Sequence, residues 1–267
     1  MTTHAPLDRT PAPTSPTATT PVPTTRPSAL RRTGLVAAGV VASLLPTVWT
    51  AGTVVELVTG AERDHLFHQF TGQGLLLGAL WLGGLLPMLI AGWRGVRPGA
   101  AAGALHLSVV AGAVVAAAMA PGNGGLVVGG ILTVTGALVW AALPLRPRVV
   151  PNGLDPVLAP LALAAAALFV PFLIGEAGLQ NAMHDEHAEF SHYYDMVWIG
   201  VALVLAAVAA ATVPAARRLA LVAMLGITVV GAARFAFTPE TTWSLTAAGL
   251  GIVGAAATAA RLARRAG

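Results

Sequence analysis

The sequence contains neither cysteine nor lysine, and each absence excludes a class of chemistry. Without cysteine the chain has no disulfide, no thiolate metal site, no iron–sulfur cluster and no cysteine nucleophile. All fifteen basic residues are arginine, so no lysine amine is present to form a Schiff base with retinal or pyridoxal phosphate. A metal held by side chains would therefore depend on histidine and carboxylate ligands.

Charge is also scarce. Charged residues make up 10% of the chain and hydrophobic residues 56%, with a mean hydropathy of +0.76. Soluble domains carry about 25% charged residues. Several apolar runs approach the roughly 20 residues that a helix needs to cross a bilayer core. The composition predicts an all-α protein, a polytopic membrane helix bundle whose main partner is the lipid bilayer.

The chain divides into a short tail and a membrane domain. Residues 1–28 are rich in threonine and proline, a composition that favours a disordered tail. Residues 29–265 form the predicted transmembrane domain. Its eight apolar segments are residues 33–58, 70–93, 99–120, 124–145, 157–178, 194–213, 217–237 and 241–262.

The arginines indicate the orientation of these segments. With eight spans, all arginines except Arg63 and Arg234 fall on the same side as the two termini. Short loops rich in positive charge lie on the cytoplasmic side of a cell membrane. We therefore expect a multi-pass protein with both termini in the cytoplasm. On this interpretation the high isoelectric point reports topology and does not indicate a nucleic-acid partner.

Two histidine-rich stretches interrupt the apolar sequence. Residues 62–68 and 184–192 hold five of the seven histidines, and each stretch follows an apolar segment. Four spans separate them, which suggests a four-helix unit repeated in the same orientation, with halves 33–145 and 157–262. Both stretches would then lie on the outer surface, and we expect the helices that carry them to pack so that the two stretches approach each other.

Imidazole and carboxylate ligands in these stretches predict a site for a divalent transition metal: zinc, iron, manganese or copper. The candidate ligands are Glu62, His65, His68, Glu176, His184, Asp185, His187, Glu189 and His192. Two Glu-x-x-His pairs, with Glu56 and Glu176, also match the inventory of a di-metal carboxylate site in a helix bundle. The alternative for both stretches is a solvated outer loop that binds nothing.

Helical periodicity would divide the second stretch between two faces. If residues 184–195 form one helix, Asp185, Glu189 and His192 share a face, and His184, His187 and Ser191 form the adjacent one.

Two further polar residues lie in apolar segments. For Arg234 we expect an ion pair with Glu176, Glu56 or Glu240. For His106, in the inner half of its span, we expect a hydrogen bond to a neighbouring helix.

The sequence leaves three classes of function open. The first is a membrane metalloenzyme, a hydrolase or an oxidoreductase acting on a lipid-soluble substrate. The second is a cation transporter or receptor, although no acidic residue lies at the centre of a predicted span. The third is a non-enzymatic accessory subunit whose outer loops bind a partner membrane protein. Neither the substrate nor the reaction follows from the sequence.

Overall fold

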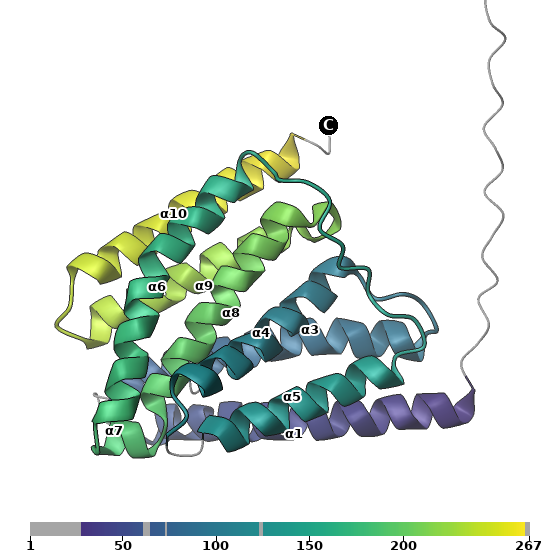
Figure 1. The fold of residues 1–267 in the computed structure, drawn as a ribbon, viewed down its shortest axis with the longest axis horizontal. Coiled ribbons are helices and arrows are strands. Elements are labelled where there is room, and N and C mark those ends of the chain that lie inside the picture. The colour runs from purple at the N-terminus through teal and green to yellow at the C-terminus, as the bar shows by residue number, and fades with distance from the viewer. Residues whose placement is uncertain (1–27, 61–64, 73, 123–124, 265–267) are drawn as a thin grey trace, which may run out of the picture.

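The computed structural model describes residues 28–60, 65–72, 74–122 and 125–264, and within these ranges the chain is helical with no strand (Figure 1). The elements, in chain order, are α1 (Ala29–Thr59), α2 (Leu66–Phe70), α3 (Leu75–Trp93), α4 (Ala100–Met119), α5 (Gly125–Ala142), α6 (Leu158–Ala182), α7 (Glu186–Glu189), α8 (His192–Thr212), η2 (Pro214–Ala216), α9 (Leu219–Phe237) and α10 (Thr242–Ala263).

The predicted number of spans is confirmed for the described part of the chain. Eight helical segments are long and apolar enough to cross a bilayer, with α2 and α3 together forming the second span. The all-α polytopic bundle predicted from composition is therefore the observed architecture. Residues 1–27, for which a tail was predicted, lie outside the described residues.

Helix α8 forms the centre of the bundle, with α4, α6 and α9 packed around it. Gly112 of α4 allows the closest approach, because a Cβ there would lie 2.8 Å from the backbone oxygen of Trp198. Two side chains of α8 then donate hydrogen bonds to carbonyl oxygens of α4. They are Trp198, whose Nε1 is 2.7 Å from Val109 O, and Tyr194, whose hydroxyl is 3.2 Å from Ala113 O. Small residues and satisfied polar groups are what hold helices together where lipid supplies no hydrophobic drive.

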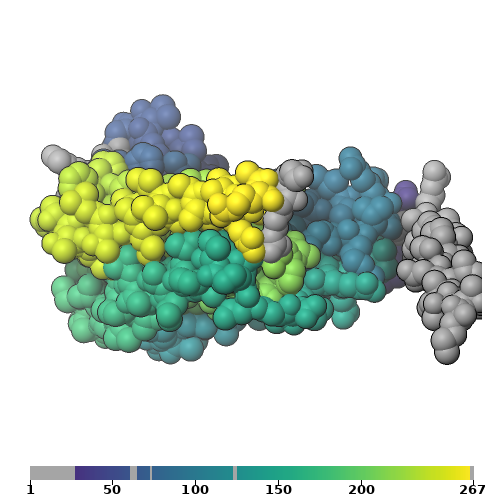
Figure 2. All heavy atoms as spheres, turned by 90° about the horizontal axis from the view of Figure 1, so that it is seen from above, coloured from purple at the N-terminus to yellow at the C-terminus, as the bar shows by residue number. Residues whose placement is uncertain are grey.

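The neighbour relations of the first four spans recur in the last four. In the first half α1 packs on α3, α3 on α4, α4 on α5, and α5 back on α1. In the second half the same cycle joins α6, α8, α9 and α10, and Figure 2 shows α10 beside α6 on one face. This pattern agrees with the predicted duplication. It also arises in any four-helix cycle, so the duplication stays a prediction.

Two ends of the bundle can be distinguished by their residues. The histidine end holds α2, α7 and the turn between α9 and α10, and at this end Phe70 of α2 stacks on Phe237 of α9 with ring centroids 5.6 Å apart. The arginine end holds the loops that precede α4, α6 and α9. There Asp155 is buried and lies 2.9 Å from Arg217 and 3.4 Å from Arg261.

Candidate metal centre

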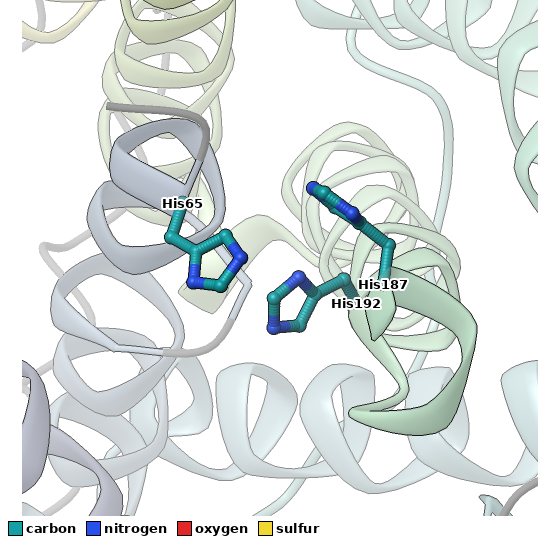
Figure 3. A group of neighbouring side chains, drawn as sticks. All are labelled: His65, His187 and His192. Atoms are coloured by element: carbon teal, nitrogen blue, oxygen red, sulfur yellow. The ribbon is translucent and has the colours of Figure 1, made fainter. Parts of the chain in front are cut away.

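Three histidines from two distant parts of the chain meet at the histidine end (Figure 3). His65 precedes α2, His187 belongs to α7, and His192 is the first residue of α8. Their ring centroids form a nearly equilateral triangle with sides of 5.1, 5.1 and 5.3 Å. One nitrogen of each ring lies within 4.8 Å of the other two. The prediction that the two histidine stretches approach each other is therefore confirmed.

A break in the helix brings His187 and His192 together. Ser191 adopts the left-handed conformation, with φ 62° and ψ 27°, between the short helix α7 and α8. A continuous helix over residues 184–195, with its two faces, is therefore not what forms. A single helix would have placed His187 and His192 on different faces, whereas the turn at Ser191 brings their two rings together. Asp185 caps the N-terminus of α7 by accepting a 2.9 Å hydrogen bond from the backbone N–H of Ala188.

Gln180 fixes this break against α6, a role that the sequence did not suggest. Its side-chain nitrogen donates to Ala188 O at 2.7 Å, and its side-chain oxygen accepts from the backbone N–H of Tyr194 at 3.0 Å. The buried side-chain amide of Gln180 therefore binds the backbone both before and after the turn at Ser191. The sequence feature that could have indicated this role is a glutamine one turn after Glu176 on an otherwise apolar helix face.

The short helix α2 delivers the histidines of the first stretch. Its Gln69 donates a 2.7 Å hydrogen bond to Glu56 near the end of α1. Phe67 is buried and lies beneath the Arg234 guanidinium, which is 5.7 Å from the ring centroid. Together with the stacking of Phe70, these contacts anchor α2 on three sides. His65 at its start and His68 one turn later then both lie at the cluster.

His68 joins the group as a fourth imidazole. It is buried, its ring stacks on His192 with centroids 4.6 Å apart, and it lies 5.4 Å from His187. The Nδ1 atoms of His68 and His192 are both buried, and within the described residues neither has a hydrogen-bond partner. Buried polar atoms without partners are uncommon in folded proteins. Lone pairs left open in this way suit a site that accepts a cation.

The carboxylates of the predicted ligand set lie outside the three-histidine group. Glu176 is buried and forms an ion pair with Arg234 at 3.3 Å. Asp185 accepts a 3.3 Å hydrogen bond from the hydroxyl of Tyr193, whose ring lies 6.0 Å from His187. Glu189 is exposed. The di-metal carboxylate arrangement is thus not assembled among the described residues.

The remaining candidates are placed as follows. His184 is exposed and does not belong to the three-histidine group. Glu62 lies outside the described residues, and Glu56 is occupied by Gln69. The donor set that the fold brings together is therefore rich in imidazole. Asp185 is linked to it through Tyr193, which hydrogen-bonds the carboxylate and lies beside His187.

An ion-paired arginine, Arg234, packs against the helix that carries His68. Arg234 of α9 contacts Glu176 at 3.3 Å and Glu240 at 3.7 Å, so two of the three expected acidic partners are confirmed. Its guanidinium also lies 4.8 Å from the Phe172 ring centroid and 5.5 Å from that of Trp243. Hydrogen bonds to Glu240, first from the backbone N–H of Trp243, hold the pKa of this carboxyl below its ordinary value despite some desolvation.

His106 is separate from the cluster and occupies the interior of the first half. It is fully buried, and the Nε1 of Trp140 donates to its Nδ1 at 3.1 Å. The prediction of a histidine hydrogen-bonded to a neighbouring helix is confirmed.

The fold and the histidine group together define a class: a polytopic helical membrane protein with a possible transition-metal site at one end. No protein-family model matches the sequence, and comparison with curated proteins and with solved structures gives no significant match.

Proposed function

We propose that this protein binds one divalent transition-metal ion through His65, His187 and His192. The observation that supports this most strongly is the approach of three imidazole nitrogens to within 4.8 Å from segments more than one hundred residues apart. A tetrahedral ion with metal–nitrogen bonds of about 2.0–2.1 Å needs ligand nitrogens about 3.3 Å apart. Small side-chain rotations close that difference, since the three rings already surround a common point.

The donor set narrows the choice of metal. Imidazole suits zinc, copper and iron, whereas manganese prefers carboxylate and other oxygen ligands. Because Glu176 and Glu56 are engaged elsewhere, we infer that zinc, copper or iron binds in preference to manganese. His68 is placed to act as a fourth ligand after a small movement, or to accept a hydrogen bond from a metal-bound water.

A three-histidine site leaves a coordination position for water or substrate, which is the arrangement of catalytic zinc centres. The centre lies at the end of apolar spans, so a lipid-soluble substrate could approach it from the bilayer. We therefore favour a membrane metalloenzyme, a hydrolase or an oxidoreductase, over a transporter. In the described spans the carboxylates of Glu56, Glu176 and Asp195 all lie near helix ends, so no acidic relay crosses the bundle.

The metal content of the purified protein tests the proposal directly. The purified wild-type protein is expected to hold about one equivalent of zinc, copper or iron by elemental analysis. His65→Ala, His187→Ala and His192→Ala should each lose most of it, since one of three ligands is removed. His184→Ala is the matched control, because this histidine lies in the same loop but outside the group, and it should keep the metal. Equal metal content in the His184 and His192 variants would refute the proposal.

We further infer that the histidine end faces the exterior and both termini the cytoplasm, from the arginine distribution. The chain has no native cysteine, so single cysteines report orientation cleanly. A cysteine at the exposed position Glu186 should react with an impermeant maleimide in intact cells. One at Val150, exposed at the arginine end, should react only after permeabilisation. The reverse labelling pattern would invert the topology.

A further inference from the structure

A groove lies between α1 and α3 toward the arginine end, away from the histidine cluster. Its volume is about 570 Å³, within the roughly 300–1,000 Å³ typical of small-molecule sites. Its lining is largely apolar and includes Val36, Val40 and Leu44 of α1 with Ile90 and Trp93 of α3. The hydroxyl of Ser43, also in the lining, donates to Gly39 O within its own helix and so offers little to a polar ligand.

The groove is open because α1 is thinly covered. Val36, Val40 and Leu44 are 47%, 54% and 57% exposed, although they lie within a candidate membrane span. In a bilayer such side chains meet lipid chains or another protein. The exposed apolar side chains of α1 thus form one continuous surface with the lining of the groove.

Two arginines stand at one end of this groove. Arg94, which follows α3, lines it directly. The guanidinium of Arg32 on α1 lies 5.5 Å from the ring centroid of Trp93, another lining residue. Within the described part of the chain neither arginine has an acidic partner, and the buried Nε of Arg32 has no hydrogen-bond partner.

Four other arginines of the described chain are engaged by acidic or carbonyl partners. Arg217 and Arg261 pair with Asp155, and Arg234 pairs with Glu176. Arg97 donates to a backbone carbonyl at 2.6 Å. What sets Arg32 and Arg94 apart is their place at the mouth of an apolar groove, with hydrocarbon contacts on one side and positive charge on the other.

We propose that this groove binds an anionic phospholipid, with an acyl chain between α1 and α3 and the phosphate at Arg32 and Arg94. The charge complementarity is direct, because guanidinium groups bind phosphate through paired hydrogen bonds. Basic pockets between membrane helices on the cytoplasmic side are suited to anionic lipid headgroups. This site does not depend on the metal centre, and it remains if no metal binds.

Native mass spectrometry of the full chain in detergent tests the proposal. The probe is palmitoyl-oleoyl phosphatidylglycerol, and phosphatidylcholine with the same acyl chains is the comparison. We expect one tightly bound phosphatidylglycerol and weaker binding of phosphatidylcholine. Arg32→Gln and Arg94→Gln should each lower the affinity about fivefold, since an arginine near an anionic headgroup contributes about a factor of this size.

Two matched variants separate the headgroup from the chain. Val40→Trp fills the groove without removing charge and should lower phosphatidylglycerol binding. Val127→Trp adds the same bulk on the exposed surface of α5 and should not. Arg148→Gln removes an arginine at the same end outside the groove, and binding should be unchanged.

Three results would overturn the proposal. Equal binding of the two lipids, or unchanged binding in both arginine variants, would show that the groove does not select an anionic headgroup. Displacement of the lipid by millimolar inorganic phosphate would identify a soluble anion as the ligand. A dimer that Val40→Trp disrupts, with no phosphatidylglycerol bound to the monomer, would assign the groove to a second copy of the chain.

Discussion

The two ends of the bundle bury polar side chains in opposite ways. At the arginine end the Asp155 carboxylate accepts hydrogen bonds from two backbone N–H groups and lies against Arg217 and Arg261. At the histidine end the Nδ1 atoms of His68 and His192 are buried, and in the described structure they have no hydrogen-bond partner. A buried polar group with its partners in place stabilises a fold, whereas one without them raises its free energy.

The difference indicates two roles. The Asp155 carboxylate finds its partners within the chain, so it ties the loop before α6 to the start of α9 and to α10. The histidine cluster leaves two buried Nδ1 atoms without a partner in the described structure, and three of its imidazoles approach one another closely. Loss of a partner at the arginine end should therefore lower stability, whereas loss of a histidine at the other end should abolish binding.

The largest effect on stability is expected from Asp155→Ala. Removing one partner of a buried ion pair costs about 3–5 kcal/mol, and partial exposure of Arg217 and Arg261 reduces this to about 2–3 kcal/mol. Thermal unfolding in detergent measures the loss. Asp155→Asn keeps the shape and the cap but removes the charge, so it should lose less. A wild-type melting temperature in the alanine variant would show that the cluster is not a structural tie.

The same residue predicts an acid dependence. Burial alone would raise the pKa of Asp155, but hydrogen bonds from two backbone N–H groups and the Arg261 guanidinium outweigh it and lower the pKa. Its contribution to stability is therefore present above the ordinary carboxyl pKa and is lost as the pH falls through the lowered value. Wild type and Asp155→Asn should differ in stability at neutral pH and converge in strong acid.

Metal removal should lower stability at the histidine end by a comparable amount. A ligand at one hundred times its dissociation constant stabilises the folded state by about 2.7 kcal/mol. Chelation at pH 7.5 should lower the melting temperature of the wild type and of His106→Ala, but not that of His192→Ala. Because imidazolium does not bind metal, the effect of the chelator should fade once the pH is low enough to protonate the histidine ligands. An identical chelator effect in the His192 variant would place the metal elsewhere.

Arg234→Met should have a smaller and mixed effect. It leaves the buried Glu176 without its ion pair, at a cost of about 1–3 kcal/mol before the added apolar contact with Phe172 offsets part of it. The arginine also lies over Phe67 next to His68, so metal affinity should fall as well. Glu240→Gln is the control, because that contact is longer and exposed, and both properties should change little. Unaltered metal affinity in Arg234→Met would show that the Arg234–Glu176 ion pair does not contribute to metal binding.

The smallest effect is expected at Ser191. A left-handed conformation costs a residue with a side chain about 1–2 kcal/mol, and glycine avoids that cost while adding backbone entropy to the unfolded chain. Ser191→Gly should therefore stabilise by less than about 1 kcal/mol and keep the metal. Ser191→Val should weaken metal binding, because a β-branched residue disfavours the turn that joins His187 to His192. Equal metal affinity in both variants would mean that the turn does not position the ligands.

The spans and the meeting of the two histidine stretches were predictable from the sequence. Apolar runs of bilayer length have few alternatives to helices, because lipid cannot satisfy backbone polar groups. Successive spans cross the membrane in alternate directions, so the loops before α2 and after α6 were expected on the same side of the membrane. The acidic partner of Arg234 was predictable for the same reason, since few charges are available at that end.

The local geometry of the site was less accessible. Helical periodicity distributed His187 and His192 over different faces, because nothing in the residue type of Ser191 signals a left-handed turn. The inventory of carboxylates suggested a di-metal site, but an inventory does not show which acids are already paired. Glu176 pairs with an arginine 58 residues away, and Gln180 bridges the turn through hydrogen bonds that only the packed helices bring into range.

The measurement that tests the central claim most directly is X-ray absorption at the edge of the bound metal in the purified protein. We predict a first shell of nitrogen at about 2.0–2.1 Å with the outer-shell scattering of three or four imidazoles. That imidazole signal should fall by one ring in His68→Ala if His68 is a ligand, and the whole spectrum should change in His192→Ala. A shell of oxygen ligands without imidazole scattering, or a spectrum unaffected by loss of His192, would contradict the account.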